Sequence, residues 1–248
     1  MVKLAEQLVP VAAAAVLYTR RWRSLRQRPP AWKGACFFAG LTVLVVALVS
    51  PIDRIGEERL FWVHMCQHVL IGDVAPFLFV LGLNGPLLRP VLALPGVYRL
   101  RVLTHPFVAL PLWAVNLGVW HLPVLYDAAL AHDSVHALQH GMFFACGALV
   151  WSTLFAMLPC PRWFGTGSRA LYLAGMWFYS LALSSVFLWS THPFYSRYTT
   201  ADQRIGGGVM LLEGSAVMLG VLVWLGLRWF AEAEARQRLL DAQAYPSS

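Results

Sequence analysis

The feature that most constrains this chain is a series of long apolar segments separated by short polar loops. A helix needs about 20 mostly apolar residues to cross the hydrocarbon core of a bilayer. Because an isolated strand leaves backbone groups unsatisfied in lipid, each such segment is expected to be a helix. The sequence therefore predicts an all-α polytopic membrane protein, a bundle of about seven transmembrane helices. The predicted spans are residues 4–19, 34–51, 60–83, 106–122, 135–158, 170–190 and 206–229.

The composition supports a membrane location. Of the 248 residues, 58% are hydrophobic and 12% are charged, against roughly 25% charged residues in an ordinary soluble domain. Span 4–19 is the weakest prediction, because it is short and contains Glu6 and Gln7. No internal repeat or soluble segment is evident, so residues 1–248 are expected to form a single transmembrane helical domain.

The basic residues indicate how the bundle is oriented. Lys and Arg are enriched in cytoplasmic loops. In a seven-span arrangement, the segments 20–33, 84–105, 159–169 and the tail from 228 share one side, and they hold 14 of the 19 basic residues. We therefore expect the N-terminus outside and the C-terminus in the cytoplasm. This distribution accounts for the net charge of +7, so the lipid bilayer, not nucleic acid, is the expected partner.

Several classes of protein lack support in the sequence. The four cysteines, at 36, 66, 146 and 160, form no C-x-x-C pair, so neither a disulfide framework nor a zinc finger is predicted. The N-terminus lacks the pattern of a cleaved signal peptide. No P-loop, G-x-S-x-G or H-E-x-x-H motif is present. We therefore expect no enzyme activity of the nucleotide-hydrolysing or zinc-protease kinds.

The histidines form the most informative pattern. On the predicted topology, seven of the eight lie near the outer membrane surface. His64 and His68 are four residues apart in the third span, and His136 and His140 have the same spacing in the fifth, so each pair shares one helical face. Together the pairs can offer four imidazoles to one ion. Imidazole suits copper, zinc, iron and nickel, and Cys66 is a possible soft ligand that would favour Cu(I).

The remaining histidines carry weaker predictions. A single histidine at a membrane interface is usually a hydrogen-bonding residue. His121 closes the fourth span at the outer face and is a possible further ligand. His192 and His132 lie in predicted outer loops. His192 either forms a capping hydrogen bond there or lies on a path to the metal site. His105 lies on the inner side and is expected to precede a helix that begins with proline.

Four carboxylates are further candidates for second-shell or pathway roles. Asp73 lies within the third span near Pro76; it is either functional, as ionisable groups at membrane depth often are, or bonded to a turn opened by the proline. Glu213 could orient an imidazole or pair with a basic residue. Asp127 could assist an entering cation. Asp202 opens the last span before three glycines, a pattern typical of a helix cap followed by a close helix contact.

Three segments resemble a known family. The letters H-M-C-Q-H at 64–68, followed by A-P at 75–76 and L-G at 81–82, resemble the signature of the CtaG-type assembly factors of caa(3)-type cytochrome c oxidases. The family's second block is matched by W-H-L-P at 120–123, Y-D-A-A-L at 126–130 and the histidines at 136 and 140. The third match is D-Q at 202–203 with G-G at 206–207. The resemblance covers roughly residues 35–230.

The resemblance implies help in maturing a haem–copper oxidase at its copper centres, in a bacterial inner membrane. We therefore hypothesise an assembly factor, not an enzyme, that holds copper transiently and passes it to oxidase subunits. The hypothesis assigns the ion to four histidines, with His121 as a possible fifth ligand: His64, His68, His136 and His140. One alternative is a redox protein with axial histidines on a b-type haem. Another is a metal transporter, which would need polar groups below the histidines, where Asp73 is the main candidate.

Overall fold

A computed structural model describes residues 2–157 and 160–244, and within these ranges all regular structure is helical. The all-α prediction is confirmed. The elements in chain order are α1 (Val2–Ser24), α2 (Ala31–Val49), α3 (Ile52–Glu58), α4 (Phe61–Val69), η1 (Leu70–Val74), α5 (Ala75–Gly82), α6 (Gly85–Leu92), η2 (Val97–Thr104), α7 (Pro106–Trp120), α8 (Pro123–Ala131), α9 (Asp133–Leu154), α10 (Thr166–Leu188) and α11 (Thr200–Ala244).

Several of these helices can cross a membrane, as predicted. Four are long and apolar enough: α2, the continuous stretch Phe61–Gly82, α10 and α11. The pair α7 and α8, bent by 69°, brings the number to five if it forms one broken span. The chain is therefore a multi-pass membrane protein. The predicted segments 4–19 and 135–158 also fall on helices, α1 and α9, but neither meets the same criteria, so the count of seven stays a prediction.

The largest difference from a predicted boundary is at the end of α11, and the composition of α9 explains why that helix does not meet the criteria for a span. Helix α11 continues to Ala244, well past residue 229, because the tail is rich in Ala, Glu, Arg and Leu, which are strong helix formers. Helix α9 begins with the residues D-S-V-H-A-L-Q-H, whose polar side chains lower its hydropathy. Residue 158, the predicted end of this span, lies outside the described residues.

The third predicted span contains a widened turn. Residues Leu70–Val74 form a π-helical turn, closed by a bond from the Ala75 N–H to the Leu70 carbonyl. The next residue, Pro76, has no N–H to donate, and the helix accommodates it by widening ahead of it and then continuing to Gly82. Single π turns recur at functional sites in α-helices. This one carries Asp73.

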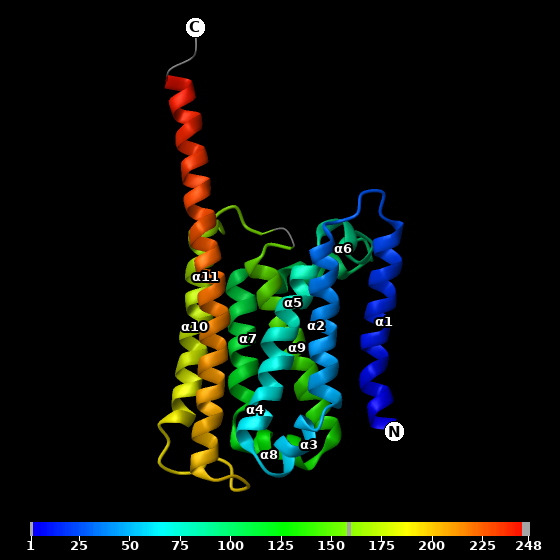
Figure 1. The fold of residues 1–248 in the computed structure, drawn as a ribbon, viewed down its shortest axis with the longest axis vertical. Helices are drawn as coiled ribbons and strands as arrows, with labels where there is room; N and C mark the ends of the chain where they lie inside the picture. Colours follow the sequence, from blue (N-terminus) through cyan, green and yellow to red (C-terminus); the bar gives the residue numbers. More distant parts are fainter. Residues whose placement is uncertain (1, 158–159, 245–248) are drawn as a thin grey trace.

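The helices form an elongated bundle (Figure 1). The α10–α11 pair lies at one edge and α1 at the other, with α4, α5, α7 and α9 in the middle. Figure 1 also shows α3, α8 and the α10–α11 connection at one end, whereas the α1–α2 connection, α6 and the C-terminus lie at or beyond the other. We call the first of these the α3–α8 end.

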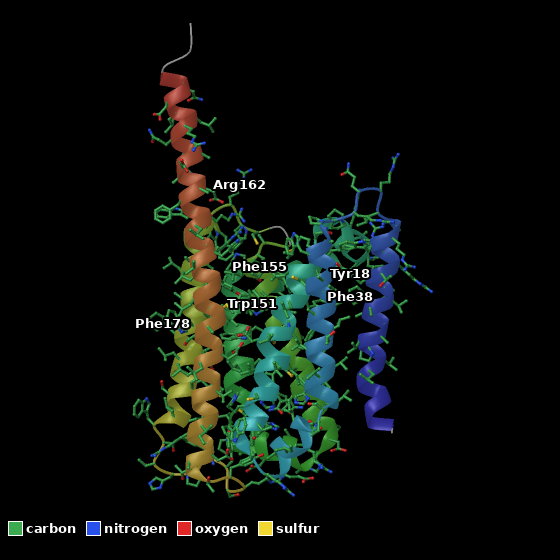
Figure 2. All side chains as sticks on the ribbon, viewed as in Figure 1. Tyr18, Phe38, Trp151, Phe155, Arg162 and Phe178 are labelled. Carbon is green, nitrogen blue, oxygen red and sulfur yellow. The ribbon has the colours of Figure 1, made fainter. Side chains whose placement is uncertain are left out.

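The interior and the outer surface differ in what they contact. Trp151 is fully buried among the middle helices, whereas Phe178 on α10 is 70% exposed and points outward (Figure 2). Large exposed apolar side chains are a liability in water but are suited to lipid. Tyr18 ties α1 to the bundle, since its ring stacks on Phe37 with centroids 3.7 Å apart and its hydroxyl donates to the Gly82 carbonyl at 3.0 Å.

Candidate metal centre

Helices α4 and α9 bring the two predicted histidine pairs together near the α3–α8 end. The ring centroids are 4.1 Å apart within each pair, His64–His68 and His136–His140. Between the helices, the centroids of His64 and His136 are 5.3 Å apart, and those of His68 and His140 are 5.5 Å apart. All four side chains are buried. We call these four residues the α4–α9 histidine cluster.

Three members of the cluster are placed to share an ion. His64, His68 and His136 each offer one ring nitrogen, and the three nitrogens lie within 4.8 Å of one another. Both ring nitrogens of His64 and His68, and Nε2 of His136, are buried without a protein hydrogen-bond partner. Buried polar atoms are rarely left unsatisfied in native proteins. Neutral imidazoles converging in this way can coordinate a metal ion.

A carboxylate on α3 orients one of these imidazoles. Glu57 Oε1 lies 2.6 Å from His136 Nδ1. A carboxylate accepts the hydrogen on Nδ1, which leaves Nε2 with its lone pair available for an ion. Asp53, Glu57 and His136 also form a second group whose ligand atoms lie within 4.8 Å of one another. The Asp53 carboxylate in turn accepts from Gln67 Nε2 at 2.7 Å.

Asp53 and Glu57 were not among the site residues predicted from the sequence. The available signal was their four-residue spacing in a short connection on the predicted outer face. That spacing marks one face of a helix, but nothing in the sequence showed that this short connection is helical. The structure places this face against α4 and α9.

His121 borders the cluster. It is 7% exposed, and its ring centroid lies 6.4 Å from that of His68. Its Nδ1 lies 2.7 Å from the Leu117 carbonyl, which can only accept, so the hydrogen is on Nδ1. Nε2 is then the free lone pair, and it is buried without a partner. His121 therefore offers a free lone pair beside the cluster, although it is not among the three histidines whose nitrogens lie within 4.8 Å of one another.

Close packing of α3 on α4 positions the cluster. A Cβ atom on Gly56 would lie 2.8 Å from the His64 Cα and 2.9 Å from its backbone nitrogen. Only glycine allows two backbones to approach this closely. The Tyr198 hydroxyl, from the α10–α11 connection, donates to the Gly56 carbonyl at 2.8 Å. These contacts of Gly56 with His64 and Tyr198 hold α3 in place. They also fix Glu57, the next residue, whose carboxylate contacts His136.

Asp202 positions α4 from a distant part of the chain. Its carboxylate accepts from the Phe61 N–H at 2.7 Å and from the Trp62 N–H at 3.3 Å. These are N–H groups at the first turn of α4, which no helical carbonyl can satisfy. Asp202 was expected to cap its own helix; it instead caps the helix that carries His64 and His68. The close helix contact predicted for the glycines is present, since a Cβ on Gly206 would clash with Phe61.

Two stacked tyrosines lie beside the histidine cluster, Tyr126 on α8 and Tyr195 in the α10–α11 connection. Tyr126 and Tyr195 stack with centroids 3.8 Å apart, and the Tyr195 hydroxyl donates to the His121 carbonyl at 2.7 Å. Burial, aided by the negative charge of Asp127, raises the pKa of Tyr195 above its usual value. The hydroxyl therefore keeps its hydrogen and remains a donor to His121.

Two carboxyl groups lie deeper in the bundle. Trp151 Nε1 donates to Asp73 Oδ1 at 2.8 Å, and the Glu213 carboxyl lies close enough to that of Asp73 to interact with it. Glu213 thus contacts a carboxyl group and not an imidazole. Asp73 is bonded to side chains and not to the widened turn before Pro76. Both residues line a cavity of about 70 Å³ that His68 and His121 also line.

The other candidates lie apart from the cluster. Cys66 is half-buried and belongs to neither metal-binding group found among the described residues. Asp127, His132 and His192 are exposed. His105 precedes α7, which begins at Pro106 as predicted, and its Nδ1 accepts from the Phe107 N–H at 3.4 Å.

Comparison with known proteins places most of the chain in one family. Residues 16–232 match the family model described as cytochrome c oxidase caa3 assembly factor. Uncharacterised proteins of Mycobacterium bovis and Mycobacterium tuberculosis are each 24% identical to this chain over 247 residues. The matches cover 87% of this chain and 37% of each relative, so the chain spans little more than a third of their length. No solved structure matches.

Proposed function

Since the chain belongs to the cytochrome c oxidase caa3 assembly factor family, we propose that it holds a copper ion at the α4–α9 histidine cluster and passes it to an oxidase subunit. The observation that supports this proposal is the convergence of three buried ring nitrogens, from His64, His68 and His136, within 4.8 Å of one another. Two helices supply them, so the site depends on the fold and not on a local motif.

The chemistry of the site suits a transient copper ion. Imidazole nitrogens bind copper well, and a neighbouring thioether favours the cuprous form. The thioether of Met65 is buried and lines the cavity that His68 and His121 share. A delivery site should lie near one end of the bundle, where a partner can reach it. The cluster meets this requirement, because its histidines lie in the parts of α4 and α9 that directly follow α3 and α8 in the chain.

We further propose that the α3–α8 end faces outward from a bacterial inner membrane in a seven-span arrangement. The segments rich in Arg and Lys belong to the opposite end, and such segments are retained in the cytoplasm. The resemblance to the assembly factors implies a role in loading the copper centres of a haem–copper oxidase, and this loading is expected at the outer face of the membrane. The histidine cluster would then lie near the outer face, where the oxidase receives its copper.

The geometry favours an ion over a b-type haem. The rings of His64 and His136 lie nearly parallel, 17° apart, with centroids separated by 5.3 Å, and His68 and His140 fill the adjacent space. A macrocycle needs a pocket of several hundred Å³, whereas the cavity that His68 and His121 line measures about 70 Å³. A larger cavity of about 690 Å³ is lined by residues of α1, α2 and α9, but His140 is the one histidine in its wall, and a haem with two axial histidines needs a second. A haem between α4 and α9 would therefore require the helices to separate.

The geometry also favours holding over transport. Beyond Asp73, the bundle interior is filled by a packed apolar group that includes Trp113, Val150, Trp151 and Leu154. A transported cation would need polar groups that continue through this region. The cavity that His68 and His121 line also contacts Trp113 and the two carboxyl groups, and the packed apolar group beyond them suits a site that retains an ion near one face.

The proposal is tested by metal analysis of the purified protein together with its optical spectrum. We expect about one copper per chain and no Soret band. Replacing His68 or His140 with Ala should lower copper content several-fold, because each change removes one of the cluster's imidazoles. His192→Ala, in an exposed loop, is the matched control and should leave copper content unchanged.

The same variants in the native host extend the test to the oxidase. Loss of His68 or His140 should lower the copper content and activity of the oxidase, whereas His192→Ala should not. Wild-type copper binding and oxidase activity in both cluster variants would show that the histidines are not copper ligands. A Soret band that disappears in the cluster variants would instead support the haem alternative.

A further inference from the structure

The short helix α3 carries two carboxylates beside the histidine cluster. Asp53 and Glu57 are four residues apart, so both lie on one face of α3. One oxygen of each carboxylate and one ring nitrogen of His136 lie within 4.8 Å of one another. Nδ1 is the nitrogen that Glu57 approaches, at 2.6 Å. We call these three residues the α3 carboxylate site, which shares His136 with the cluster.

The α3 carboxylate site lies at the edge of the protein, whereas the cluster is buried. The Glu57 side chain is 24% exposed, and Asp53 is also partly exposed. The histidines at 64, 68 and 136 are each at most 7% exposed. Helix α3 lies at one end of the bundle (Figure 1). An ion in the surrounding water can therefore reach the two carboxylates without entering the bundle.

A buried amide oxygen beside Asp53 lacks a partner. Gln67 is fully buried, and its Nε2 donates to the Ala47 carbonyl at 3.0 Å and to Asp53 Oδ1 at 2.7 Å. These two bonds fix the orientation of the amide, whose Oε1 has no hydrogen-bond partner. The oxygen and nitrogen of an amide are about 2.3 Å apart, so Oε1 lies within about 5 Å of the Asp53 carboxylate. A cation, or a water bound to it, would satisfy this buried acceptor.

The charge of the site suits a divalent cation. Within the part of the chain that the structure describes, no arginine or lysine forms a salt bridge with Asp53, and the hydrogen-bond partner of its carboxylate is the neutral Gln67. Two carboxylates balance two positive charges. Carboxylate oxygens suit Mg²⁺, Ca²⁺ and Mn²⁺, whereas the imidazoles of the cluster suit copper. The two neighbouring sites therefore favour different ions.

His136 cannot serve both sites at once. A neutral imidazole has one N–H and one lone pair. While Glu57 accepts the hydrogen on Nδ1, the lone pair is on Nε2, where the cluster can use it. A cation held by the carboxylates would take a lone pair on Nδ1, and the hydrogen would then be on Nε2. Each ion therefore weakens the binding of the other.

We propose that Asp53, Glu57 and His136 bind a divalent cation, and that this cation and the copper ion of the cluster exclude each other from His136. The antagonism rests on the proposed function, whereas the cation site stands independently of it. The exchange moves one hydrogen between the two nitrogens of His136 and involves no redox change. A divalent cation that binds at the α3–α8 end would thus favour release of copper at the end where a partner can receive it.

The cation site is tested with Mn(II) and the purified protein, because free Mn(II) gives a strong electron paramagnetic resonance signal that is lost on binding. We expect about one Mn(II) per chain, with pulsed spectra showing coupling to one imidazole nitrogen. Asp53→Asn should lower Mn(II) affinity about tenfold or more, since it removes a charged ligand, while its Oδ1 can still accept from Gln67. Glu58→Gln removes the same charge from an exposed position on α3 and should bind Mn(II) as the wild type does.

The antagonism is tested by adding Cu(I) anaerobically to the Mn(II)-loaded protein. Cu(I) has no unpaired electron, so the signal of released Mn(II) is read directly. Saturating Mn(II) should weaken Cu(I) binding by about 10- to 100-fold, the usual effect of losing the carboxylate behind a ligating histidine, and Cu(I) should weaken Mn(II) binding by the same factor. In Asp53→Asn, the same Mn(II) concentration should have no effect on Cu(I) affinity.

Each result bears on a different part of the proposal. Equal Mn(II) binding by the wild type and Asp53→Asn, or spectra without imidazole coupling, would overturn the α3 carboxylate site and leave the proposed function intact. Binding of both ions together at unchanged affinities would overturn the sharing of His136. Mn(II) binding by a wild type that binds no copper would overturn the proposed function but not the α3 carboxylate site.

Discussion

At the scale of single residues, the imidazole of His136 shows how a ligand's orientation is decided by its neighbour. A histidine ring has two nitrogens, and the one available to a metal is set by the bond that the other makes. Glu57, from α3, lies 2.6 Å from Nδ1 of His136, so Nε2 keeps the lone pair that can bind a metal ion. The Leu117 carbonyl does the same for His121. Neither partner is adjacent in sequence to the histidine that it orients.

Replacing Glu57 should weaken the site without removing a cluster histidine. We expect Glu57→Gln to lower copper affinity by about 10- to 100-fold, the usual effect of losing a carboxylate behind a ligating histidine. Competition against a copper chelator of known affinity measures this change. Glu58→Gln, the adjacent and exposed carboxylate, is the matched control. Equal affinities in the two variants would mean that Glu57 does not orient a ligand.

At the scale of elements, the short helix α3 and the start of α11 both act on α4. Gly56 lets the α3 backbone lie directly against His64. Asp202 caps the first turn of α4, although it lies 141 residues after Phe61 in the chain. The position of α4, which carries His64 and His68, therefore depends on contacts with α3 and α11, two elements that carry no histidine of the cluster.

A methyl group at Gly56 should disturb the site through packing alone. Gly56→Ala would place a Cβ 2.8 Å from the His64 Cα, so α3 must shift, at a cost of about 1–3 kcal/mol. We expect a lower thermal unfolding temperature and weaker copper binding. Gly141→Ala adds the same methyl group on α9 beside His140, where nothing lies within 4 Å, and it should leave both quantities near wild type. Wild-type values for Gly56→Ala would show that the contact is not restrictive.

At the scale of the whole molecule, the bundle separates basic connections from the histidine cluster. The α1–α2 connection and the C-terminal part of α11 lie away from the α3–α8 end (Figure 1). The basic residues concentrate in these and the other segments predicted to be cytoplasmic. The proposed orientation follows from this separation, because basic segments resist export.

Labelling of introduced cysteines tests the orientation. In a chain whose four native cysteines are replaced by Ser, Thr191→Cys lies in the α10–α11 connection and Gln27→Cys in the α1–α2 connection; both positions are exposed and uncharged. A thiol reagent that cannot cross membranes should label position 191 in intact cells and position 27 only after the membrane is opened. The reverse pattern would place the cluster on the cytoplasmic side.

The sequence by itself determined the fold class, the approximate position of most helices and the histidine pairs. Apolar length and loop polarity are local properties, and a four-residue spacing already places His64 with His68 and His136 with His140 on single helix faces. These predictions needed no knowledge of which helices are neighbours. The prediction of a membrane span is weaker for α9, which is long enough to cross a bilayer but begins with polar residues, among them His136 and His140.

Only the tertiary structure decided which groups meet. It set α4 against α9 so that two pairs became one cluster, excluded Cys66, Asp127 and His192 from it, and brought Glu57 to His136. It also joined Asp73 to Glu213 from helices 140 residues apart in sequence. Such contacts arise from side-chain packing between helices, and the periodicity of each helix indicates which face is buried but not which neighbour covers it.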